Sequence, residues 1–305
     1  MHVIITGSNA KLLSGELATH LTGRHHSITL YPFSFAEYCD VRNVDVFSKS
    51  TRAVAAIRTA FDDYMRQGGF PEVQFISDDK EYINELVNNI LKRDIEQRFK
   101  ISYTASFEQL AHHLLNVSPA IVVDKNLQEI FNLKSQHTAK NYVSYLKQAY
   151  LLVGLHKFSA KSRQRVVGEK VYAIDVALMN KRENAFAGEN LGWRLETIVY
   201  IELLRRYKSK GKDIYYHSDR SGECDFLICE NNKVLAAIQV SYDITSPRTR
   251  KREISGLILA ARKTGCVDLL LLTDHQYEEI DESGFHISIL PVYDFLLSDP
   301  LNKIR

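Results

Sequence analysis

Basic side chains gather in two neighbouring groups near the middle of the sequence, one on a predicted helix and one around a predicted turn. Each contact between a protein cation and a nucleic-acid phosphate releases condensed counterions, so clustered cations are what phosphate binding needs. The two groups indicate a DNA contact, while a protein-docking surface and a solvated turn are the alternatives. The residues are Lys134, His137, Lys140 and Lys147 on the helix, and Lys157, Lys161, Arg163 and Arg165 around the turn.

The elements that position these cations can be predicted from the spacing of apolar residues. Three helical segments are expected, and two apolar strands should follow them around the basic turn. Three helices and a hairpin in this order indicate a winged helix, whose third helix is the candidate recognition helix. The predicted helices cover residues 106–116, 127–131 and 135–149, and the strands cover 151–158 and 170–174.

A second set of residues with possible chemistry lies nearer the carboxyl end. Glu196 lies on the predicted helix LGWRLETIVYIELLRR, Asp225 lies in ECDFLI, and Gln239 lies in IQVS. This order resembles the PD-(D/E)XK nuclease core. The resemblance implies that Glu196, Asp225 and Gln239 surround Mg²⁺, while a lysine two residues beyond the last ligand positions or activates the attacking water.

Ser241 stands where that lysine is expected, and a serine can neither supply the positive charge nor lower the pKa of the water. The difference favours a degenerate metal-binding or nucleic-acid-binding fold, with a Mg²⁺-dependent nuclease as the alternative. Without such chemistry, Asp225 would be a strand residue paired with Arg220 or a nearby lysine, and Glu196 an exposed helix carboxylate. The cations that could migrate into the missing role are Lys233, Arg250 and Lys251.

The N-terminal residues predict a strand, a helix and a second strand of an α/β domain. Residues 2–6 form a short apolar run, residues 10–22 have the spacing of an amphipathic helix that Gly23 closes, and residues 27–31 form another apolar run. The small polar residues Ser8 and Asn9 follow the first strand, where α/β proteins place ligands.

The string TGSNAKLLSGELATHLTGRHHSITLYPFSFAEY closely resembles bacterial and archaeal AAA-type ATPases that carry a C-terminal nuclease-like domain of unknown function. The resemblance extends more loosely along the chain, through GGFPEV and through SQHTAKNYVSYLKQAYLLVGLHKFS, which is similar to the winged-helix element of that family. It implies that Ser8 and Asn9 take the sensor-1 position and that Arg24 is an arginine finger. A solvated helix terminus is the alternative for Arg24.

The G-x-x-x-x-G-K-[ST] loop that holds the phosphates in such ATPases does not occur in the sequence. Residues 269–274 imitate a Walker B strand, but they lie in the wrong domain and are expected to be a core strand. The resemblance implies a chain truncated at its front, which starts at the sensor-1 strand. We therefore expect no autonomous ATP hydrolysis, and ATP binding only with a partner that supplies the P-loop.

The predicted fold is α/β and multidomain, with four parts. They are a partial AAA-type α/β remnant (residues 1–40), a helical lid or connector (41–104), the winged helix (105–180) and a restriction-endonuclease-like α/β domain (181–305). The last part is expected to be separate, with its own core. Its predicted helices cover residues 191–208 and 246–264, and its strands cover 213–217, 224–229, 234–240 and 267–273.

Composition restricts the possible partners and the compartment. The 305 residues are 45% hydrophobic and 25% charged, with 39 basic and 37 acidic side chains and a net charge of +2. This balance gives no global case for nucleic acid or membranes. No secretory signal and no apolar run of about 20 residues is present, so a cytoplasmic protein without a membrane partner is expected. Reduced thiols without zinc-site spacing are expected for Cys39, Cys224, Cys229 and Cys266.

These patterns predict a prokaryotic member of the AAA-type ATP-binding family that acts as a nucleic-acid-binding or partner-binding module. The expected partners are DNA, a separately encoded P-loop fragment, or a toxin/antitoxin-like or other protein. No cofactor is certain, although Mg²⁺ is possible at the C-terminal domain. A Mg²⁺-dependent PD-(D/E)XK-type nuclease and an oligomerisation or docking protein are the alternative functions.

Overall fold

The computed structural model describes residue 4 and residues 28–159, 168–180, 190–220, 222–231 and 233–301. The strand and helix predicted over residues 2–6 and 10–22 lie outside this part of the chain. The same holds for several predicted site residues, namely Ser8, Asn9, Arg24, Lys161, Arg163 and Arg165.

The strand predicted over residues 27–31 is wrong for the residues that the structure describes. Residues 28–31 form no strand, and Ile28 and Leu30 are 78% and 90% exposed. Side chains that favour strands do so by packing on a pleated, half-buried surface. Among the described residues, no strand pairs with this segment.

The residues between 35 and 99 are mostly helical, as predicted. Ser34 and Glu37 form a capping box at the start of the first helix, because each side chain accepts a hydrogen bond from the other residue's backbone N–H. The predicted interruption is also confirmed, since the second helix ends at Gly68, whose φ is 76°. The elements are α2 (Phe35–Val41), α3 (Thr51–Gln67), η1 (Glu72–Gln74), α4 (Asp79–Asn89), η2 (Ile90–Glu96) and α5 (Gln97–Phe99).

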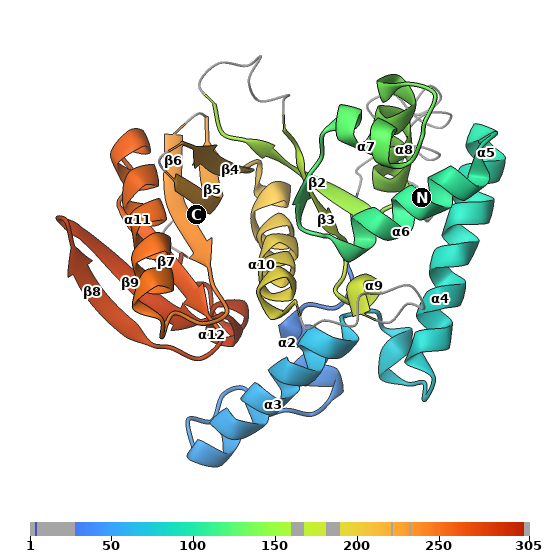
Figure 1. Ribbon diagram of the computed structural model, residues 1–305. Coiled ribbons are helices and arrows are strands. Elements are labelled where there is room, and N and C mark those ends of the chain that lie inside the picture. Colours follow the sequence, from blue (N-terminus) through green and yellow to red (C-terminus); the bar gives the residue numbers. More distant parts are fainter. Residues whose placement is uncertain are drawn as a thin grey trace.

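The middle of the chain contains the predicted helices and hairpin, with one additional short strand. The new strand, β1, pairs with the second strand of the hairpin, so that β3 lies between β1 and β2. Figure 1 places α7 and α8 at the upper end of this hairpin, away from α11. The elements are α6 (Thr104–Asn116), β1 (Ala120–Ile121), α7 (Asp124–Ile130), α8 (Gln136–Gln148), β2 (Leu152–Lys157), β3 (Lys170–Ala173) and α9 (Ala177–Asn180).

The C-terminal part alternates helices and strands, and its predicted elements are all present. A further hairpin and a short helix follow the last predicted strand. The elements are α10 (Leu191–Tyr207), η4 (Lys208–Lys210), β4 (Asp213–Asp219), β5 (Gly222–Glu230), β6 (Lys233–Val240), α11 (Pro247–Thr264), β7 (Asp268–Thr273), β8 (Glu278–Glu282), β9 (Phe285–Pro291) and α12 (Val292–Leu297).

One mixed sheet joins the middle and C-terminal parts. Its nine strands have the order β1-β3-β2-β4-β5-β6-β7-β9-β8. The link between the two parts is the parallel pair β2 and β4, which matches only His156 with Tyr215 and Lys157 with Tyr216. The sheet therefore crosses the domain boundary predicted at residue 180.

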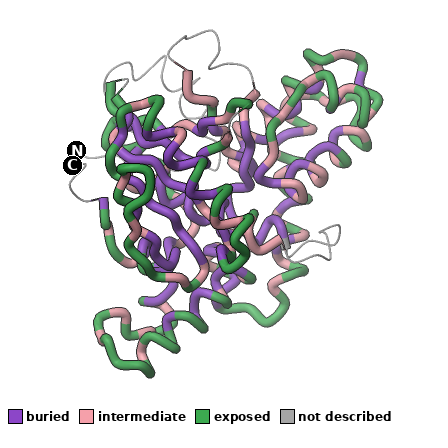
Figure 2. The backbone as a smooth tube through the Cα atoms, turned by 60° about the vertical axis from the view of Figure 1, so that its left-hand side comes forward, coloured by how far each residue is buried: buried purple, intermediate pink, exposed green. Residues whose placement is uncertain are grey.

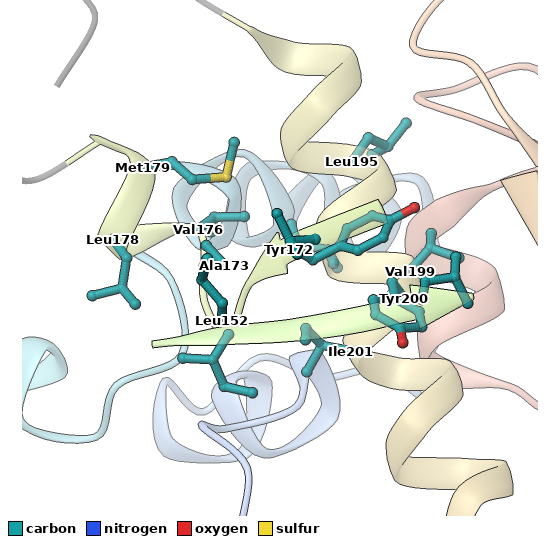
Figure 3. Close-up of a cluster of buried hydrophobic side chains, with 14 of the residues drawn as sticks. Leu152, Tyr172, Ala173, Val176, Leu178, Met179, Leu195, Val199, Tyr200 and Ile201 are labelled. Carbon is teal, nitrogen blue, oxygen red and sulfur yellow. The ribbon is translucent and has the colours of Figure 1, made fainter. Parts of the chain in front are cut away.

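The hydrophobic core is also shared across that boundary. One cluster of buried residues extends from α2 to α12 and includes both the β2–β3 hairpin and α10. In Figure 3, Leu152 and Tyr172 of the hairpin lie against Val199, Tyr200 and Ile201 of α10. Figure 2 shows buried backbone running through the middle of the molecule.

A second buried cluster lies between α11 and the opposite face of the sheet. The C-terminal part thus has a core of its own on one face and shares a core with the helical and hairpin parts on the other. The expectation of a fully separate core is wrong on the α10 face, because α10 is buried by the hairpin. Among the described residues, no helix is both long enough and apolar enough to cross a membrane.

Candidate functional site

The predicted recognition helix, α8, has one buried and one exposed face. Ala139, Tyr142, Val143 and Leu146 are buried in the shared core, and Ser135 caps the helix by accepting from the backbone N–H of Thr138 at 3.1 Å. Residues three or four positions apart share a helix face. The face turned to solvent includes the exposed side chains of His137 and Lys140, while Lys134, which was predicted on this helix, is exposed just before the N-cap Ser135.

The exposed cations near the start of α8 differ in their ion pairing and burial from Lys147 and Lys157, which follow them in the sequence. Within the described part of the chain, no salt bridge is formed by Lys134 or Lys140. Lys147, by contrast, is half-buried and donates to both carboxylate oxygens of Glu169, at 2.6 and 2.7 Å. Lys157 is half-buried at the end of β2. Of the described members of the predicted basic group, Lys134, His137 and Lys140 are therefore the most available to a ligand.

Two of the three predicted metal ligands come together around a lysine that the sequence did not reveal. Lys170, the first residue of β3, places its Nζ 2.7 Å from Oε1 of Glu196 and 3.9 Å from Oδ1 of Asp225. The same ammonium lies 3.5 Å from Oε1 of Glu223. Tyr172 also donates to Oε1 of Glu196, at 2.7 Å. The side chains of Lys170, Glu196 and Asp225 are buried, at only 9%, 12% and 8% exposed, whereas that of Glu223 is 45% exposed.

Gln239, the third predicted ligand, faces away from this cluster. Its Nε2 donates to Glu253 of α11 at 2.7 Å, and its Oε1 accepts from the backbone N–H of Asp225 at 3.2 Å. Because successive strand residues point to opposite faces, and Ile238 belongs to the α10 side, Gln239 lies on the α11 side. The structure brings together Glu196 and Asp225 but not the Gln239 side chain.

The cations considered as substitutes for the missing lysine do not reach the cluster. Arg250 forms a salt bridge with Glu278 at 2.8 Å. Lys233 and Lys251 are exposed. Ser241 donates from its hydroxyl to the carbonyl oxygen of Asp243 at 3.3 Å. The cation beside Asp225 is instead Lys170, which lies 71 positions before Ser241 in the chain and belongs to a different predicted domain.

The structure can be compared with the non-catalytic alternatives, in which Asp225 is an ion-paired strand residue and Glu196 is an exposed helix carboxylate. Asp225 is next to a lysine, as one alternative had it, but that lysine is Lys170 and not Arg220. Glu196 is not an exposed helix carboxylate, since the residue is only 9% exposed. Within the described residues, no group of three His, Cys, Asp or Glu side chains has an arrangement that could hold a metal ion.

The electrostatics of the cluster follow from burial and from its three neighbouring carboxyl groups. Burial alone would lower the pKa of Lys170, but the charges of Glu196 and Asp225 raise it above its ordinary value. Burial raises the pKa of Asp225 well above its usual range, and the charge of Glu196 adds to the effect. Lys170 and the backbone N–H of Val240 act in the opposite direction. The lysine is therefore held in its charged form.

A second buried polar site was missed by the sequence analysis. Asp175, after β3, accepts from the backbone N–H of Gly69 at 2.8 Å and of Ala177 at 2.7 Å. Burial raises the pKa of Asp175 to about 6, against the lowering effect of these two donors. An added Cβ on Gly68 would lie 1.9 Å from Oδ1 of Asp175, and one on Gly69 would lie 2.4 Å from the carbonyl oxygen of Phe33.

This contact explains the GGFPEV string, which the sequence analysis could only assign to a tight turn. The two glycines let the turn pack directly against Asp175 and against the backbone before α2, where the N–H of Phe33 donates to Gly69 at 2.7 Å. The only sequence signal was a single acid within the otherwise apolar run VYAIDVALM. The site joins three segments and is structural.

A groove lined by both apolar and polar residues borders the outer end of the sheet. Its volume is about 730 Å³, and its lining includes Phe47, Val267 and Tyr277, which are 92%, 74% and 72% exposed. Groups of exposed apolar residues are a feature of docking surfaces. The groove is the feature closest to the predicted docking alternative.

Comparisons with known proteins place the chain among uncharacterized relatives. Residues 1–39 match an AAA domain, residues 58–188 match a domain of unknown function (DUF8612), and residues 191–295 match another (DUF4143). The AAA resemblance of the first 39 residues is thereby confirmed. No solved structure matches the chain.

Two relatives align with almost the whole chain. An uncharacterized protein of Haemophilus influenzae is 29% identical over 304 residues, which cover 97% of this chain and 70% of that protein. The uncharacterized protein MJ1544 of Methanocaldococcus jannaschii is 33% identical over 311 residues, which cover 97% of this chain and 69% of the relative. The first 39 residues of this chain correspond to part of an AAA domain, and residues 58–188 and 191–295 correspond to domains of unknown function. The chain therefore belongs to the same family as MJ1544.

Proposed function

We propose that this chain is a DNA-binding module that contacts the phosphate backbone through the exposed face of α8. The observation that carries the proposal is the pair of exposed ammonium groups, Lys134 and Lys140, that form no salt bridge within the described residues. The sequence contains no P-loop, so the proposal assigns no ATP hydrolysis to this chain.

The topology around α8 supports this function. The order α6, β1, α7, α8, β2, β3, with β3 between β1 and β2, is the order of a winged helix. In helix-turn-helix proteins, the recognition helix lies in the major groove and its neighbours contact the backbone. The buried side of α8 is fixed by the shared core, and α8 directs its polar face outward from a rigid support.

Polar side chains near the two lysines fit the same role. His137 is exposed and its Nδ1 lies 3.1 Å from Nδ2 of Asn141, one turn further along α8. Amide and imidazole groups can hydrogen-bond to phosphates and to base edges. Two cations without a salt bridge among the described residues predict modest affinity and a slope of log K against log salt of about −2, because each phosphate contact contributes about −0.9.

The geometry favours binding over cleavage. A nuclease needs its carboxylates and its cation at a surface that DNA can reach. Here the side chains of Glu196, Asp225 and Lys170 are about nine-tenths buried and bonded to one another. The position expected to hold the catalytic lysine is Ser241. We therefore assign no hydrolytic step to this cluster.

The test is fluorescence anisotropy with a labelled DNA duplex over a series of NaCl concentrations. The double variant K134E/K140E should weaken binding by at least about tenfold and reduce the slope of log K against log salt by about 1–2, since each lost phosphate contact removes about 0.9. The matched control is K233E/K251E, which makes the same charge change at two exposed lysines in the C-terminal part.

The control should bind as wild type does. If both double variants weaken binding equally, only net charge matters and α8 is not the contact surface. If wild type shows no salt-dependent affinity for duplex DNA at low salt, the proposed function is wrong.

A further inference from the structure

The carboxylates expected to hold Mg²⁺ already surround a cation that belongs to the protein. The Nζ of Lys170 lies 2.7, 3.5 and 3.9 Å from oxygens of Glu196, Glu223 and Asp225, which come from α10 and β5. These are the distances of hydrogen bonds and ion pairs. A protein ammonium therefore stands among the three carboxylates.

The remaining hydrogen bonds leave poor access for a metal ion. Oε1 of Glu196 accepts from both Lys170 and Tyr172, each at 2.7 Å, which uses both of its lone pairs. Oδ2 of Asp225 accepts from the N–H of Val240 at 2.9 Å. Mg²⁺ requires oxygens at about 2.0–2.1 Å in near-octahedral geometry. It could not bind Oε1 of Glu196 without displacing Lys170, so the residues present do not fit a divalent metal.

We propose that Lys170 takes the place of the divalent cation, so that the cluster is a metal-independent clamp fastening β3 to α10 and β5. Such a clamp would strengthen the connection between the hairpin and the C-terminal strands. The sheet connects the hairpin to the C-terminal strands through only two residue pairs, His156 with Tyr215 and Lys157 with Tyr216. Lys170 adds a charged link between the hairpin and α10, beside the shared core and the hydrogen bond from the Tyr200 hydroxyl to the carbonyl oxygen of Gly154 at 2.6 Å. This inference does not depend on DNA binding by α8.

The charge balance explains why a lysine can serve. A single ammonium satisfies one oxygen directly at 2.7 Å and lies near two more carboxylates. Glu196 and Asp225 are buried, whereas the side chain of Glu223 is 45% exposed, and buried ionic groups persist only when they are paired. If the ammonium is removed, the carboxylates remain as a group of like charges that only another cation can stabilise. The chain would then have a latent site for a divalent ion.

The experiment measures Mn²⁺ binding by the loss of the free-ion signal in electron paramagnetic resonance. Wild type should bind no Mn²⁺ at the cluster. Any weak Mn²⁺ binding by wild type should therefore be unchanged in Glu196→Gln and in Asp225→Asn. Lys170→Ala should bind Mn²⁺ at least about tenfold more tightly than wild type does, because it opens the space beside three carboxylates. Adding D225N to K170A should remove the gain.

The matched control is Lys212→Ala, which deletes another buried lysine, 3.3 Å from Glu230 and outside the cluster. It should create no Mn²⁺ site. Two results would overturn the proposal: specific Mn²⁺ binding by wild type that is lost in E196Q, or a folded K170A variant that binds no Mn²⁺. The first result needs no lysine variant, so the proposal remains testable if K170A does not fold.

Discussion

Replacement of Lys170 by methionine should lower the free energy of unfolding, and the burial of Lys170, Glu196 and Asp225 determines by how much. Methionine keeps much of the volume but leaves Glu196 and Asp225 without their shared cation. The three side chains are 9%, 12% and 8% exposed, so water cannot replace the lost charge. Removal of one partner of a buried ion pair costs about 3–5 kcal/mol. Native domains are stable by only about 5–15 kcal/mol, so the loss is a large fraction of the total.

The assay is urea unfolding followed by circular dichroism. With a denaturant slope of about 3 kcal/mol per M, the midpoint of K170M should fall by about 1 M or more. The matched control is Lys208→Met, whose ion pair with Asp213 has a similar length, 3.0 Å, but side chains that are 60% and 55% exposed. An exposed pair contributes at most about 1 kcal/mol. If K170M unfolds at the same urea concentration as K208M, the ammonium is not a stabilising clamp and the reasoning is refuted.

Two further predictions concern the contact between the glycine turn and Asp175. Gly68→Ala should cost more than about 1 kcal/mol in thermal unfolding, because its φ is 76° and the new Cβ would lie 1.9 Å from Asp175 Oδ1; Gly211→Ala, with φ 73° and nothing within 4 Å, carries the backbone strain alone and should cost less. Equal losses in the two variants would show that the close approach is unimportant. The pKa of Asp175 is raised from 3.8 to about 6, so between those values the folded protein holds a proton that the unfolded chain has released. Its stability therefore falls as pH rises from about 4 to about 6, by at most about 3 kcal/mol. Unfolding of Asp175→Asn, compared with wild type over this range, should lack that slope, and identical pH profiles would contradict the assignment.

Local patterns were sufficient to predict most helices and strands. The α8 face could be predicted because a single helix carries Ala139, Tyr142 and Leu146 on one side and His137 and Lys140 on the other, and 3.6-residue periodicity is visible in a few turns of sequence. Strands β4 to β7 could be predicted from short apolar runs bounded by turn residues. The strand over residues 27–31 failed because a strand depends on a pairing partner as much as on its own residues.

Contacts between distant segments could not be predicted in this way. The order of elements was sufficient to select Asp225 and Glu196. The direction of the Gln239 side chain depends on strand alternation relative to the irregular β4–β5 pairing near Asp225, and the sequence does not display that irregularity. The contact between Gly69 and Asp175 spans 106 positions. Nothing in either local sequence indicates the other, because such a contact is set by how whole elements pack.

The origin of Lys170 has a consequence for evaluating nuclease-like sequences in general. A motif search looks for the lysine on the strand that follows the aspartate, two residues beyond the last ligand, because strand alternation places it there. In this fold that position is Ser241, while the cation beside Asp225 comes from a hairpin of the preceding predicted domain. Sharing one sheet and one core is what lets a residue of one predicted domain complete the charge balance of another. The missing lysine at Ser241 therefore does not leave the carboxylates unpaired. Lys170 supplies their cation and also links the hairpin to α10, so a role in stability is a sufficient reason for Glu196 and Asp225 to be buried together.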